Sequence, residues 1–298
     1  MTSGTADTIT MDLNGAYKKI NSILSGMADS GFDALCIFEQ FITKREELLA
    51  FPERECDETR LQRAVNAAYR RTEGYPLQYI LGEWEFYGRT FKVGEGVLIP
   101  RPDTETLIDE AQRIIDSFDG KRRMVCADLC AGSGCIGITL ERNNPGKLRM
   151  YAVELSGDVF PYLVDNIGRH GAEIVMIRGD ISNGVLLDNF IDDDGEEMGI
   201  DLIVSNPPYL SEKEMDELQK EVTFEPSMAL YGGADGLQFY RVISRLWGEM
   251  LNKGGAIVFE IGETQRADVE KILLECGFCD INTVQYAGMD RVISARKR

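Results

Sequence analysis

The segment with the clearest chemical signature is Asn206-Pro207-Pro208-Tyr209, which directly follows the apolar run Leu202–Ser205. Two successive prolines remove two backbone N–H donors and stiffen the loop, so its carbonyl oxygens are free to accept hydrogen bonds. The side-chain oxygen of Asn206 and the carbonyl of Pro207 can therefore accept both N–H groups of an incoming –NH2 group. Tyr209 offers an aromatic face on which a flat group can stack. The simpler structural alternative is an ordinary Pro-Pro turn.

Such a loop suits a nitrogen whose lone pair is delocalised, as in an amide or an exocyclic amine. Two fixed acceptors that hold its hydrogens help to turn the lone pair toward an electrophile. They also stabilise the positive charge that develops on nitrogen in the transition state. Alignment of the reacting atoms supplies much of the remaining acceleration. This chemistry needs no strong general base, and none is evident near the motif.

A second candidate site is the glycine-rich loop Cys130-Ala131-Gly132-Ser133-Gly134, which follows Asp128 at the turn from an expected strand to an expected helix. Glycines at such a turn let the backbone approach a ligand closely. Glu154 ends the next expected strand, where an acid is placed to bind ribose hydroxyls. Asp180, followed by Ile181, comes after the third strand and offers a polar contact for an adenine amine.

Two cofactors compete for this loop, NAD and S-adenosylmethionine (SAM). The spacing Gly132-x-Gly134-x-x-Gly137 matches the dinucleotide-binding pattern. The acid at Asp128 favours SAM, because a carboxylate suits the amino group of SAM better than it suits a phosphate. In the structural alternative, Asp128 caps the following helix.

Alternating strands and helices are expected to position both loops. Near-continuous apolar strands that alternate with helices predict a parallel sheet covered on both faces. The last two strands are joined by a short loop through Gly288 and predict an antiparallel hairpin at the sheet edge. The expected strands are Met124–Leu129, Met150–Glu154, Ile174–Ile177, Leu202–Ser205, Ala256–Ile261, Asn282–Tyr286 and Arg291–Ala295; the expected helices include Thr104–Phe118, Val159–His170, Leu237–Leu251 and Gln265–Cys276.

The region before this alternation is expected to be helical. Apolar residues recur at helical spacing from Met11 to about Arg71, with a break at Gly31 and an N-cap at Asp57. The alternating segment Glu85–Val93 then predicts a hairpin. These patterns divide the chain into a helical domain at 1–80, a hairpin connector at 81–100 and a sheet domain at 101–298. Residues 1–10 are expected to be disordered, and 192–197 to form an exposed acidic loop.

Composition narrows the classes of protein that fit. The formal net charge is −18, from 32 Lys and Arg against 50 Asp and Glu. That excess disfavours a nucleic-acid partner, because cationic side chains supply most non-specific affinity for phosphates. No leader sequence and no apolar run long enough to cross a bilayer are evident, so we expect a cytoplasmic protein with no membrane contact. Seven scattered cysteines do not form a disulfide framework, and Cys276-x-x-Cys279 alone does not make a metal site, so no metal is expected.

The motifs together resemble one family. Asn206-Pro207-Pro208-Tyr209 is similar to the loop of amino-methyltransferases that act on adenine, cytosine or glutamine nitrogens. Three further motifs look like those of the glutamine methyltransferases of peptide chain release factors, the HemK/PrmC family. They are Gly82-Glu83-Trp84-Glu85-Phe86-Tyr87-Gly88, Val97-Leu98-Ile99-Pro100-Arg101-Pro102-Asp103-Thr104-Glu105, and Glu225-Pro226 followed by Ala229-Leu230 and the 232–237 segment Gly-Gly-Ala-Asp-Gly-Leu. The resemblance covers nearly the whole chain.

The resemblance implies an α/β fold of the Rossmann-like class I SAM-dependent methyltransferases, with a seven-stranded, mostly parallel sheet, a small N-terminal helical domain and a β-hairpin connector. It implies SAM as the methyl donor, S-adenosylhomocysteine as the product, and the glutamine of the Gly-Gly-Gln loop of class I release factors as the acceptor. The reaction would modulate translation termination.

Carried over by residue, the resemblance assigns the cofactor loop to 130–134, the ribose to Glu154, the adenine to Asp180 and Ile181, and the glutamine to 206–209. Two departures are Cys130, where the family usually has glycine, and Glu154, which is often aspartate. The role of Arg101, near the expected cleft, stays open against a structural salt bridge. We expect the N-terminal domain to recognise the release factor, and the protein to be a monomer.

Two rival functions remain. A nucleic-acid amino-methyltransferase would use the same loop, but it would need a basic surface and a way to extrude a base. A non-catalytic SAM- or nucleotide-binding regulator would have no use for a loop that orients an amine. Methyl transfer to a protein amide is therefore the favoured hypothesis.

Overall fold

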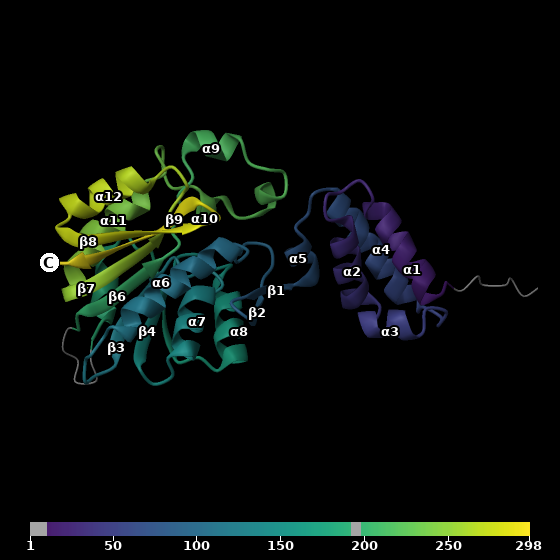
Figure 1. Cartoon of the computed structure of the whole chain (residues 1–298), viewed down its shortest axis with the longest axis horizontal. Coiled ribbons are helices and arrows are strands. Elements are labelled where there is room, and N and C mark those ends of the chain that lie inside the picture. The colour runs from purple at the N-terminus through teal and green to yellow at the C-terminus, as the bar shows by residue number, and fades with distance from the viewer. Residues whose placement is uncertain (1–10, 192–197) are drawn as a thin grey trace, which may run out of the picture. The chain divides into compact units, whose positions relative to one another are not determined.

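The computed structural model describes residues 11–191 and 198–298 and separates them into two compact units (Figure 1). One unit comprises residues 11–82 and Lys220–Phe224. The other comprises 83–191, 198–219 and Glu225–Arg298. The expectations for 1–10 and 192–197 lie outside the described residues.

The first unit is helical, and the prediction of a helical N-terminal domain is confirmed. Asp57 caps its longest helix, since its side chain accepts a 2.8 Å hydrogen bond from the Arg60 N–H. The prediction that Gly31 breaks a helix was wrong: the break comes at 25–29, and Gly31 lies in a first turn, where the loss of helix propensity is small. The helices are α1 (Leu13–Leu24), α2 (Ser30–Phe41), α3 (Arg45–Ala50), α4 (Glu58–Thr72), α5 (Leu77–Leu81) and the 3-10 turn η3 (Val222–Phe224).

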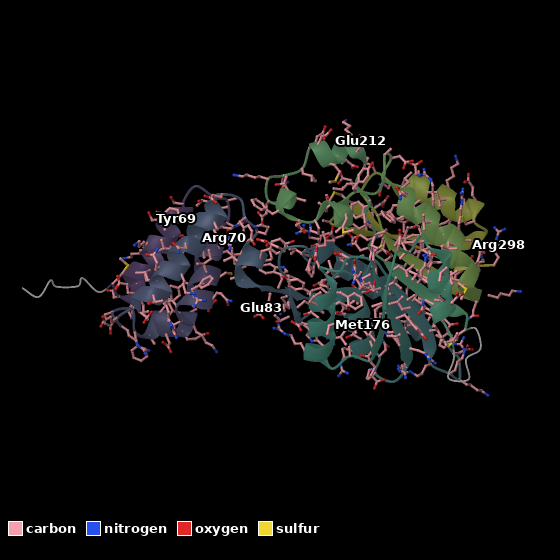
Figure 2. The ribbon with its side chains drawn as sticks, turned by 180° about the vertical axis from the view of Figure 1, so that it is seen from behind. Tyr69, Arg70, Glu83, Met176, Glu212 and Arg298 are labelled. Atoms are coloured by element: carbon pink, nitrogen blue, oxygen red, sulfur yellow. The ribbon has the colours of Figure 1, made fainter. Side chains whose placement is uncertain are left out.

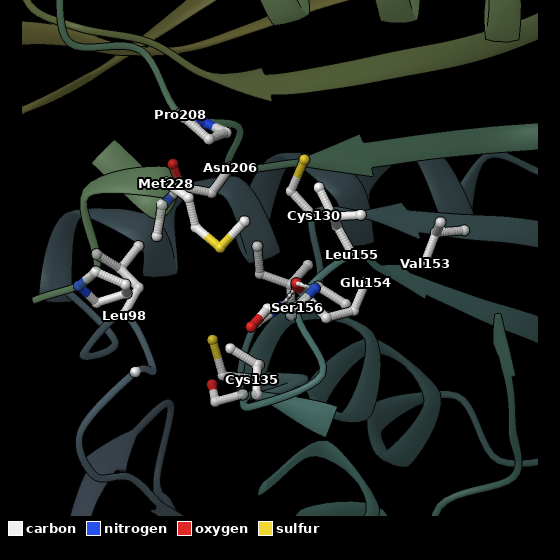
Figure 3. A pocket seen from close by; sticks show the side chains of 18 of the residues that line it. Leu98, Cys130, Cys135, Val153, Glu154, Leu155, Ser156, Asn206, Pro208 and Met228 are labelled. Carbon is white, nitrogen blue, oxygen red and sulfur yellow. Dashed lines mark hydrogen bonds between the residues drawn. The ribbon is translucent and has the colours of Figure 1, made fainter. Parts of the chain in front are cut away.

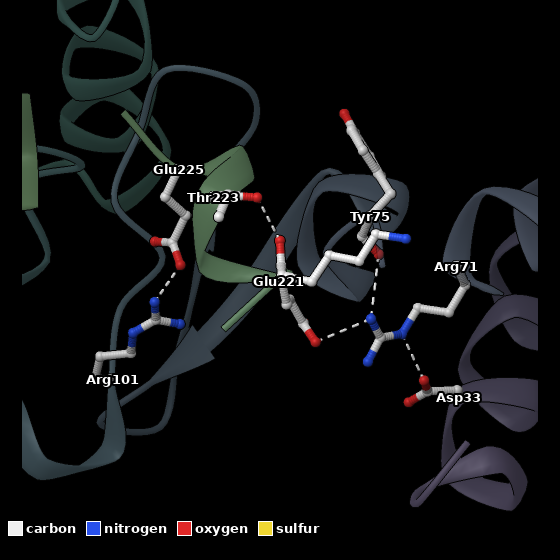
Figure 4. Close-up of polar contacts among 8 residues, drawn as sticks. Asp33, Arg71, Tyr75, Arg101, Glu221, Thr223 and Glu225 are labelled. Carbon is white, nitrogen blue, oxygen red and sulfur yellow. Dashed lines mark hydrogen bonds and ion pairs between the residues drawn. The ribbon is translucent and has the colours of Figure 1, made fainter. Parts of the chain in front are cut away.

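A buried ion-pair network ties the segment 220–224 into this helical unit (Figure 4). Arg71 donates from Nε to Asp33 at 2.6 Å and from a terminal nitrogen to Glu221 at 3.0 Å. The same terminal nitrogen lies 3.3 Å from the Tyr75 carbonyl. One guanidinium therefore joins α2, α4 and a segment that lies far away in sequence.

The second unit contains a seven-stranded sheet in the order β5-β4-β3-β6-β7-β9-β8. All neighbouring strands are parallel except β9, which is antiparallel to both β7 and β8. The predicted mostly parallel sheet and its C-terminal hairpin are confirmed. The strands are β3 (Met124–Leu129), β4 (Leu148–Glu154), β5 (Ile174–Arg178), β6 (Ile200–Ser205), β7 (Leu251–Glu260), β8 (Phe278–Tyr286) and β9 (Met289–Lys297).

Helices cover both faces of this sheet, as near-continuous apolar strands require (Figure 1). One buried cluster joins one face to the helices α6, α7 and α8, and another joins the opposite face to α11, α12 and the 3-10 turns η2 and η4. The helices of this unit are η1 (Pro102–Thr104), α6 (Glu105–Asp116), α7 (Cys135–Asn143), α8 (Phe160–His170), η2 (Gly184–Asn189), α9 (Glu212–Asp216), α10 (Ser227–Leu230), α11 (Gln238–Leu246), η4 (Trp247–Met250) and α12 (Arg266–Glu275).

The connector forms the predicted hairpin from β1 (Glu83–Phe86) and β2 (Arg89–Lys92), which pair antiparallel. Tyr87 and Gly88 turn the chain with φ of 50° and 69°. Two successive positive φ values are typical of the turns that match the twist of a hairpin.

The sheet order also places the two candidate loops side by side. β3 is central, with β4 on one side and β6 on the other, and Leu129 is in register with Ser205. The loop after β3 and the loop after β6 therefore leave the same edge of the sheet. In open α/β sheets this edge, where the strand order reverses, is where ligands bind.

Candidate active site

A cavity of about 930 Å³, part of it open to solvent, lies at the carboxyl edge of the sheet (Figure 3). The loop after β3, the ends of β4 and β5 and the loop after β6 all contribute to its walls. The segment 98–101 and the region around Met228 supply further wall residues. The predicted site residues that line it are Cys130, Ala131, Gly132, Ser133, Glu154, Asp180, Ile181, Asn206 and Pro208.

The loop after β3 is shaped by residues in the left-handed region. Cys130, Gly132 and Gly134 have φ of 62°, 56° and 81°. A Cβ on Gly134 would meet Leu163 at 2.5 Å, whereas a Cβ on Gly132 would meet nothing within 4 Å. Gly132 thus leaves open space beside the cavity that a side chain would fill. Cys130 adopts the left-handed conformation despite its Cβ, which costs about 1–2 kcal/mol.

Glu154 holds two of the loops together at the end of β4. Its Oε2 accepts a hydrogen bond from the Gly132 N–H at 2.9 Å, and its Oε1 accepts one from the Ser156 N–H at 2.8 Å. Each carboxylate oxygen can accept more than one hydrogen bond. Glu154 therefore keeps acceptor capacity at the cavity wall for hydroxyl groups of a ligand.

Asp128 lies under the loop, fully buried, and is not among the described residues that line the cavity. Its Oδ2 accepts the Gly137 N–H at 2.9 Å, in the first turn of α7, and Oδ1 has no hydrogen-bond partner among the described residues. Burial, reinforced by the nearby Glu154, raises the pKa of Asp128 to about 7. The contact with Gly137 is the one that the capping alternative requires. A contact with the amino group of SAM stays a prediction.

Asp180 and Ile181 follow β5 and are fixed by local hydrogen bonds. Asp180 Oδ1 accepts the Ser182 N–H at 2.8 Å, and the Ile181 carbonyl accepts the indole N–H of Trp247 at 2.8 Å. Trp247 is fully buried, so it anchors this stretch to the core. The stretch presents one carboxylate and one apolar side chain to the cavity.

The loop after β6 brings Asn206 and Pro208 to the cavity wall, whereas Pro207 and Tyr209 are not among the described residues that line it. Asn206 Nδ2 lies 3.4 Å from Thr104 Oγ1. The Tyr209 hydroxyl lies 3.4 Å from Glu260 Oε1. Burial raises the pKa of the Tyr209 hydroxyl. In the described part of the chain, no hydrogen bond to the Pro207 carbonyl is found, so this oxygen can still accept one.

A second loop packs directly on the backbone of this motif. A Cβ on Gly232 would lie 2.7 Å from the Pro208 carbonyl oxygen and 2.7 Å from the Tyr209 Cα. Real Cβ contacts are not that short, so a glycine is required there. Close backbone packing against the loop after β6 therefore explains the glycine at position 232 of this motif.

Several side chains at the site were not predicted from the sequence. Thr104 and Glu260 hold Asn206 and Tyr209, and Gln265 Nε2 donates to the Tyr209 carbonyl at 2.8 Å. Glu260 could have been recognised as a candidate site residue, because it is a lone acid at the end of the apolar strand Ala256–Ile261. Thr104 lies in the 97–105 motif, but that motif does not predict a contact with Asn206, and Gln265 carries no sequence signal by itself.

Arg101 lines the cavity and forms an ion pair with the buried Glu225 (Figure 4). The other oxygen of Glu225 accepts the Ile99 N–H at 3.0 Å. This pair ties the cavity segment 98–101 to the start of the Glu225-Pro226 motif. This ion pair is the structural salt bridge that was expected as the alternative to a functional role for Arg101.

Two further expectations concern a metal site and a membrane span. Cys276 follows the last residue of α12, and Cys279 lies in β8. Across 11–191 and 198–298, no cluster of three or more His, Cys, Asp or Glu side chains is arranged to hold a metal ion. None of the helices in these ranges is both long and apolar enough to cross a bilayer.

Comparisons with known proteins agree with the motifs. A family model described as the PrmC N-terminal domain matches residues 16–82. The chain is 36% identical over 295 residues to a release factor glutamine methyltransferase of Clostridium acetobutylicum, covering 96% of this chain and 98% of the relative. It is 40% identical over 234 residues to one of Clostridium botulinum, covering 76% of this chain and 77% of the relative.

Among solved structures, the catalytic domain of hMettl16 in complex with the MAT2A 3′UTR hairpin 1 has a similar fold. The TM-score is 0.53 at 13% identity, over 94% of this chain and 91% of that one. At this identity the likeness concerns the fold alone.

Proposed function

Because the chain belongs to the family of release factor glutamine methyltransferases, we propose that it methylates the side-chain amide nitrogen of the glutamine in the Gly-Gly-Gln motif of class I release factors. SAM is the proposed methyl donor. One observation carries the proposal beyond family membership. Asn206, with a side chain able to accept an amide N–H, lies on the wall of the same cavity as the glycine loop and Glu154.

The cavity residues fit SAM. Gly132 leaves room for close approach of a ligand to the backbone, and Glu154 has acceptor capacity for ribose hydroxyls. Asp180 offers a carboxylate to an adenine amine, beside apolar wall residues such as Leu155 and Ile181. The free Oδ1 of Asp128 retains the capacity to accept a further donor. When bound, SAM supplies an electrophilic methyl group on a sulfonium.

The protein's own task is to present the glutamine amide. Asn206 Oδ1 and the Pro207 carbonyl accept its two N–H groups, which directs the nitrogen lone pair and offsets the positive charge developing there. Tyr209 is proposed to offer a face to the flat amide. Pro208, Ile99 and Met228 add apolar wall residues to the cavity.

The decisive assay supplies labelled SAM to the purified protein together with intact release factor, DNA or ribosomal RNA. We expect label on the Gly-Gly-Gln glutamine of the factor and on neither nucleic acid. Label on a nucleic acid and not on the factor would support the rival amino-methyltransferase, and no label on any substrate would favour a regulator.

The role of the loop is tested by Asn206→Ala, which should lower kcat by roughly 10²–10³, by analogy with the loss of one preorganised oxyanion-hole donor. SAM affinity should be largely unchanged. Asn206→Asp keeps an acceptor oxygen and should retain partial activity, above that of Asn206→Ala. Equal kcat for wild type and Asn206→Ala at saturating SAM would mean that the motif is only a turn.

We also propose that the helical domain at 1–80 recognises the release factor, because one glutamine side chain buries too little surface to give specificity. The helical unit exposes large apolar side chains, among them Leu49, Phe51 and, as Figure 2 shows, Tyr69. Such exposed groups are frequent at interaction sites. Separately, we propose that the protein is cytoplasmic and acts as a monomer.

The recognition role is tested by the double substitution Leu49→Ser and Phe51→Ser. It should raise KM for the intact factor and leave SAM affinity and activity on a Gly-Gly-Gln peptide unchanged. Leu274→Ser on α12, which is also exposed, is the matched control. An unchanged KM in the double variant would exclude α3 and its flank as the docking surface.

A further inference from the structure

Thr104 lies between Asn206 and a buried carboxyl group at the end of β7. Its Oγ1 is 2.5 Å from Glu260 Oε2 and 3.4 Å from Asn206 Nδ2. Thr104 and Glu260 are 2% and 1% exposed, so water does not compete for these contacts. Three separate elements, η1, β7 and the loop after β6, therefore meet through one hydroxyl group.

The number of protons on the hydroxyl decides how Asn206 is oriented. Thr104 has one O–H, which donates to Glu260 Oε2. When Glu260 is ionised, above its raised pKa of about 7, its oxygens can only accept, so the Thr104 proton is used there. Oγ1 is then left with lone pairs only and can only accept from Asn206. The –NH2 half of the Asn206 amide must face Thr104, and its oxygen must face away. An unconstrained asparagine could present either end, and its –NH2 end cannot accept an N–H.

Glu260 is itself held in place from several sides. The Tyr209 hydroxyl lies 3.4 Å from its Oε1, and its backbone carbonyl accepts the Tyr240 hydroxyl at 2.9 Å. Its strand position is fixed by pairing with Val292 in β9. A buried carboxyl group is costly unless it is hydrogen-bonded. These contacts fix the orientation of the Glu260 carboxyl group, so it can hold the Thr104 hydroxyl in one orientation.

We propose that Thr104 and Glu260 are positioning residues that fix the Asn206 amide with its oxygen available to the substrate. The inference rests on the proposed methylation of an amide nitrogen, because that reaction requires an acceptor at this position. Neither residue needs to touch the glutamine. Both act through Asn206, and Glu260 also fixes the hydroxyl end of Tyr209.

The test compares Thr104→Val, which keeps the shape and removes the hydroxyl, with Thr104→Ser, which keeps the hydroxyl. Methyl transfer to intact release factor is measured together with SAM affinity by calorimetry and the melting temperature. Thr104→Val should lower kcat by about 10–100-fold, as expected for the loss of a buried hydrogen bond, and leave SAM affinity within about twofold. Thr104→Ser should restore most of the lost kcat.

A second measurement separates positioning from a merely structural role. In an Asn206→Ala background, Thr104→Val should cause little further loss of kcat, because the group it orients is gone. Glu260→Gln should lower kcat in the wild-type background and cause a smaller fold-loss in the Asn206→Ala background, where only its contact with Tyr209 remains. Wild-type kcat in Thr104→Val, or the same fold-loss in both backgrounds, would overturn the positioning role. A wild-type protein that transfers no methyl group to the factor would instead reject the proposed function and this inference with it.

Discussion

Gln265 donates a 2.8 Å hydrogen bond from its Nε2 to the backbone carbonyl of Tyr209. Its Oε1 accepts the Gly262 N–H at 2.9 Å and lies 3.2 Å from the Tyr240 hydroxyl oxygen. This one amide therefore links the start of α12 to the backbone of the loop that carries Asn206. The Tyr209 carbonyl is thus already engaged by Gln265, whereas Asn206 lines the cavity and the Pro207 carbonyl has no hydrogen bond in the described part of the chain.

Gln265→Met keeps the length of the side chain and removes its donors and its amide oxygen. We expect a loss of about 1–3 kcal/mol of unfolding free energy, because buried partners are left unsatisfied. We also expect a lower kcat with little change in SAM affinity. Chemical denaturation and methyl-transfer assays measure the two effects. Gln62→Met, at an exposed Gln–Asn pair on α4, is the control and should change the unfolding free energy by less than about 0.5 kcal/mol.

Much of the fold could be predicted from the sequence because its signals are local. The strand at Met124–Leu129 was predicted with the bounds that the structure has, since it is apolar throughout and ends at a glycine-rich turn. The short helices α3 and α5 were not predicted, because five or six residues carry too little periodicity. Nor were α9, which follows the loop after β6, and α10, which contains Ala229-Leu230 of the Glu225-Pro226 motif.

The site was only partly predictable, for a physical reason. Asn206 and Glu154 stand out because each is polar at the end of an apolar strand. Thr104 and Gln265 act on Asn206 and Tyr209 across 102 and 56 residues of chain, and no local pattern predicts such contacts. The family's preference for glycine at Cys130 is explained by the backbone conformation there. Its φ of 62° explains why glycine suits this position better.

Arg71 should be the most sensitive charged residue of the helical unit. Arg71→Met leaves the buried Asp33 carboxylate without its partner, and we expect a loss of about 3–5 kcal/mol in unfolding free energy. Urea denaturation measures it. Arg54→Met removes an exposed pair with Glu47 and should cost between zero and about 1 kcal/mol. The double variant Asp33→Leu with Arg71→Met should regain much of the loss; if it is less stable than Arg71→Met, the unpaired carboxylate is not the cause.

Glu154 should contribute to SAM affinity in two ways, through direct acceptance of hydroxyl groups and through its hold on the Gly132 N–H. We expect Glu154→Ala to weaken SAM binding by about 1–3 kcal/mol. Glu154→Gln keeps one acceptor oxygen, so calorimetry should place it between wild type and Glu154→Ala. Glu173→Ala, at an exposed pair with Arg123, is the control. Unchanged affinity in Glu154→Ala would remove this residue from the cofactor site.

Asp128 should make the stability of the protein depend on pH. Burial raises its pKa from 3.8 to about 7, so the folded state binds a proton that the unfolded state has already released between these values. A raised folded pKa means that the stabilising contribution is complete below about pH 4 and is lost as the pH rises through about 7. At about 1.4 kcal/mol per pKa unit, the loss is on the order of 4 kcal/mol as an upper bound.

Asp128→Asn does not titrate and should lose less unfolding free energy than wild type between pH 4 and pH 8. Its amide oxygen can still accept the Gly137 N–H, so the loop after β3 should keep its conformation. Glu260 acts in the same direction, because burial raises its pKa from 4.5 to about 7, so the double variant with Glu260→Gln should be flatter still. Asp188→Asn at an exposed position should follow the wild-type curve. Denaturation curves at unit steps of pH, without SAM, measure the difference. Parallel curves for wild type and Asp128→Asn would mean that Asp128 is ionised in the folded protein across this whole range.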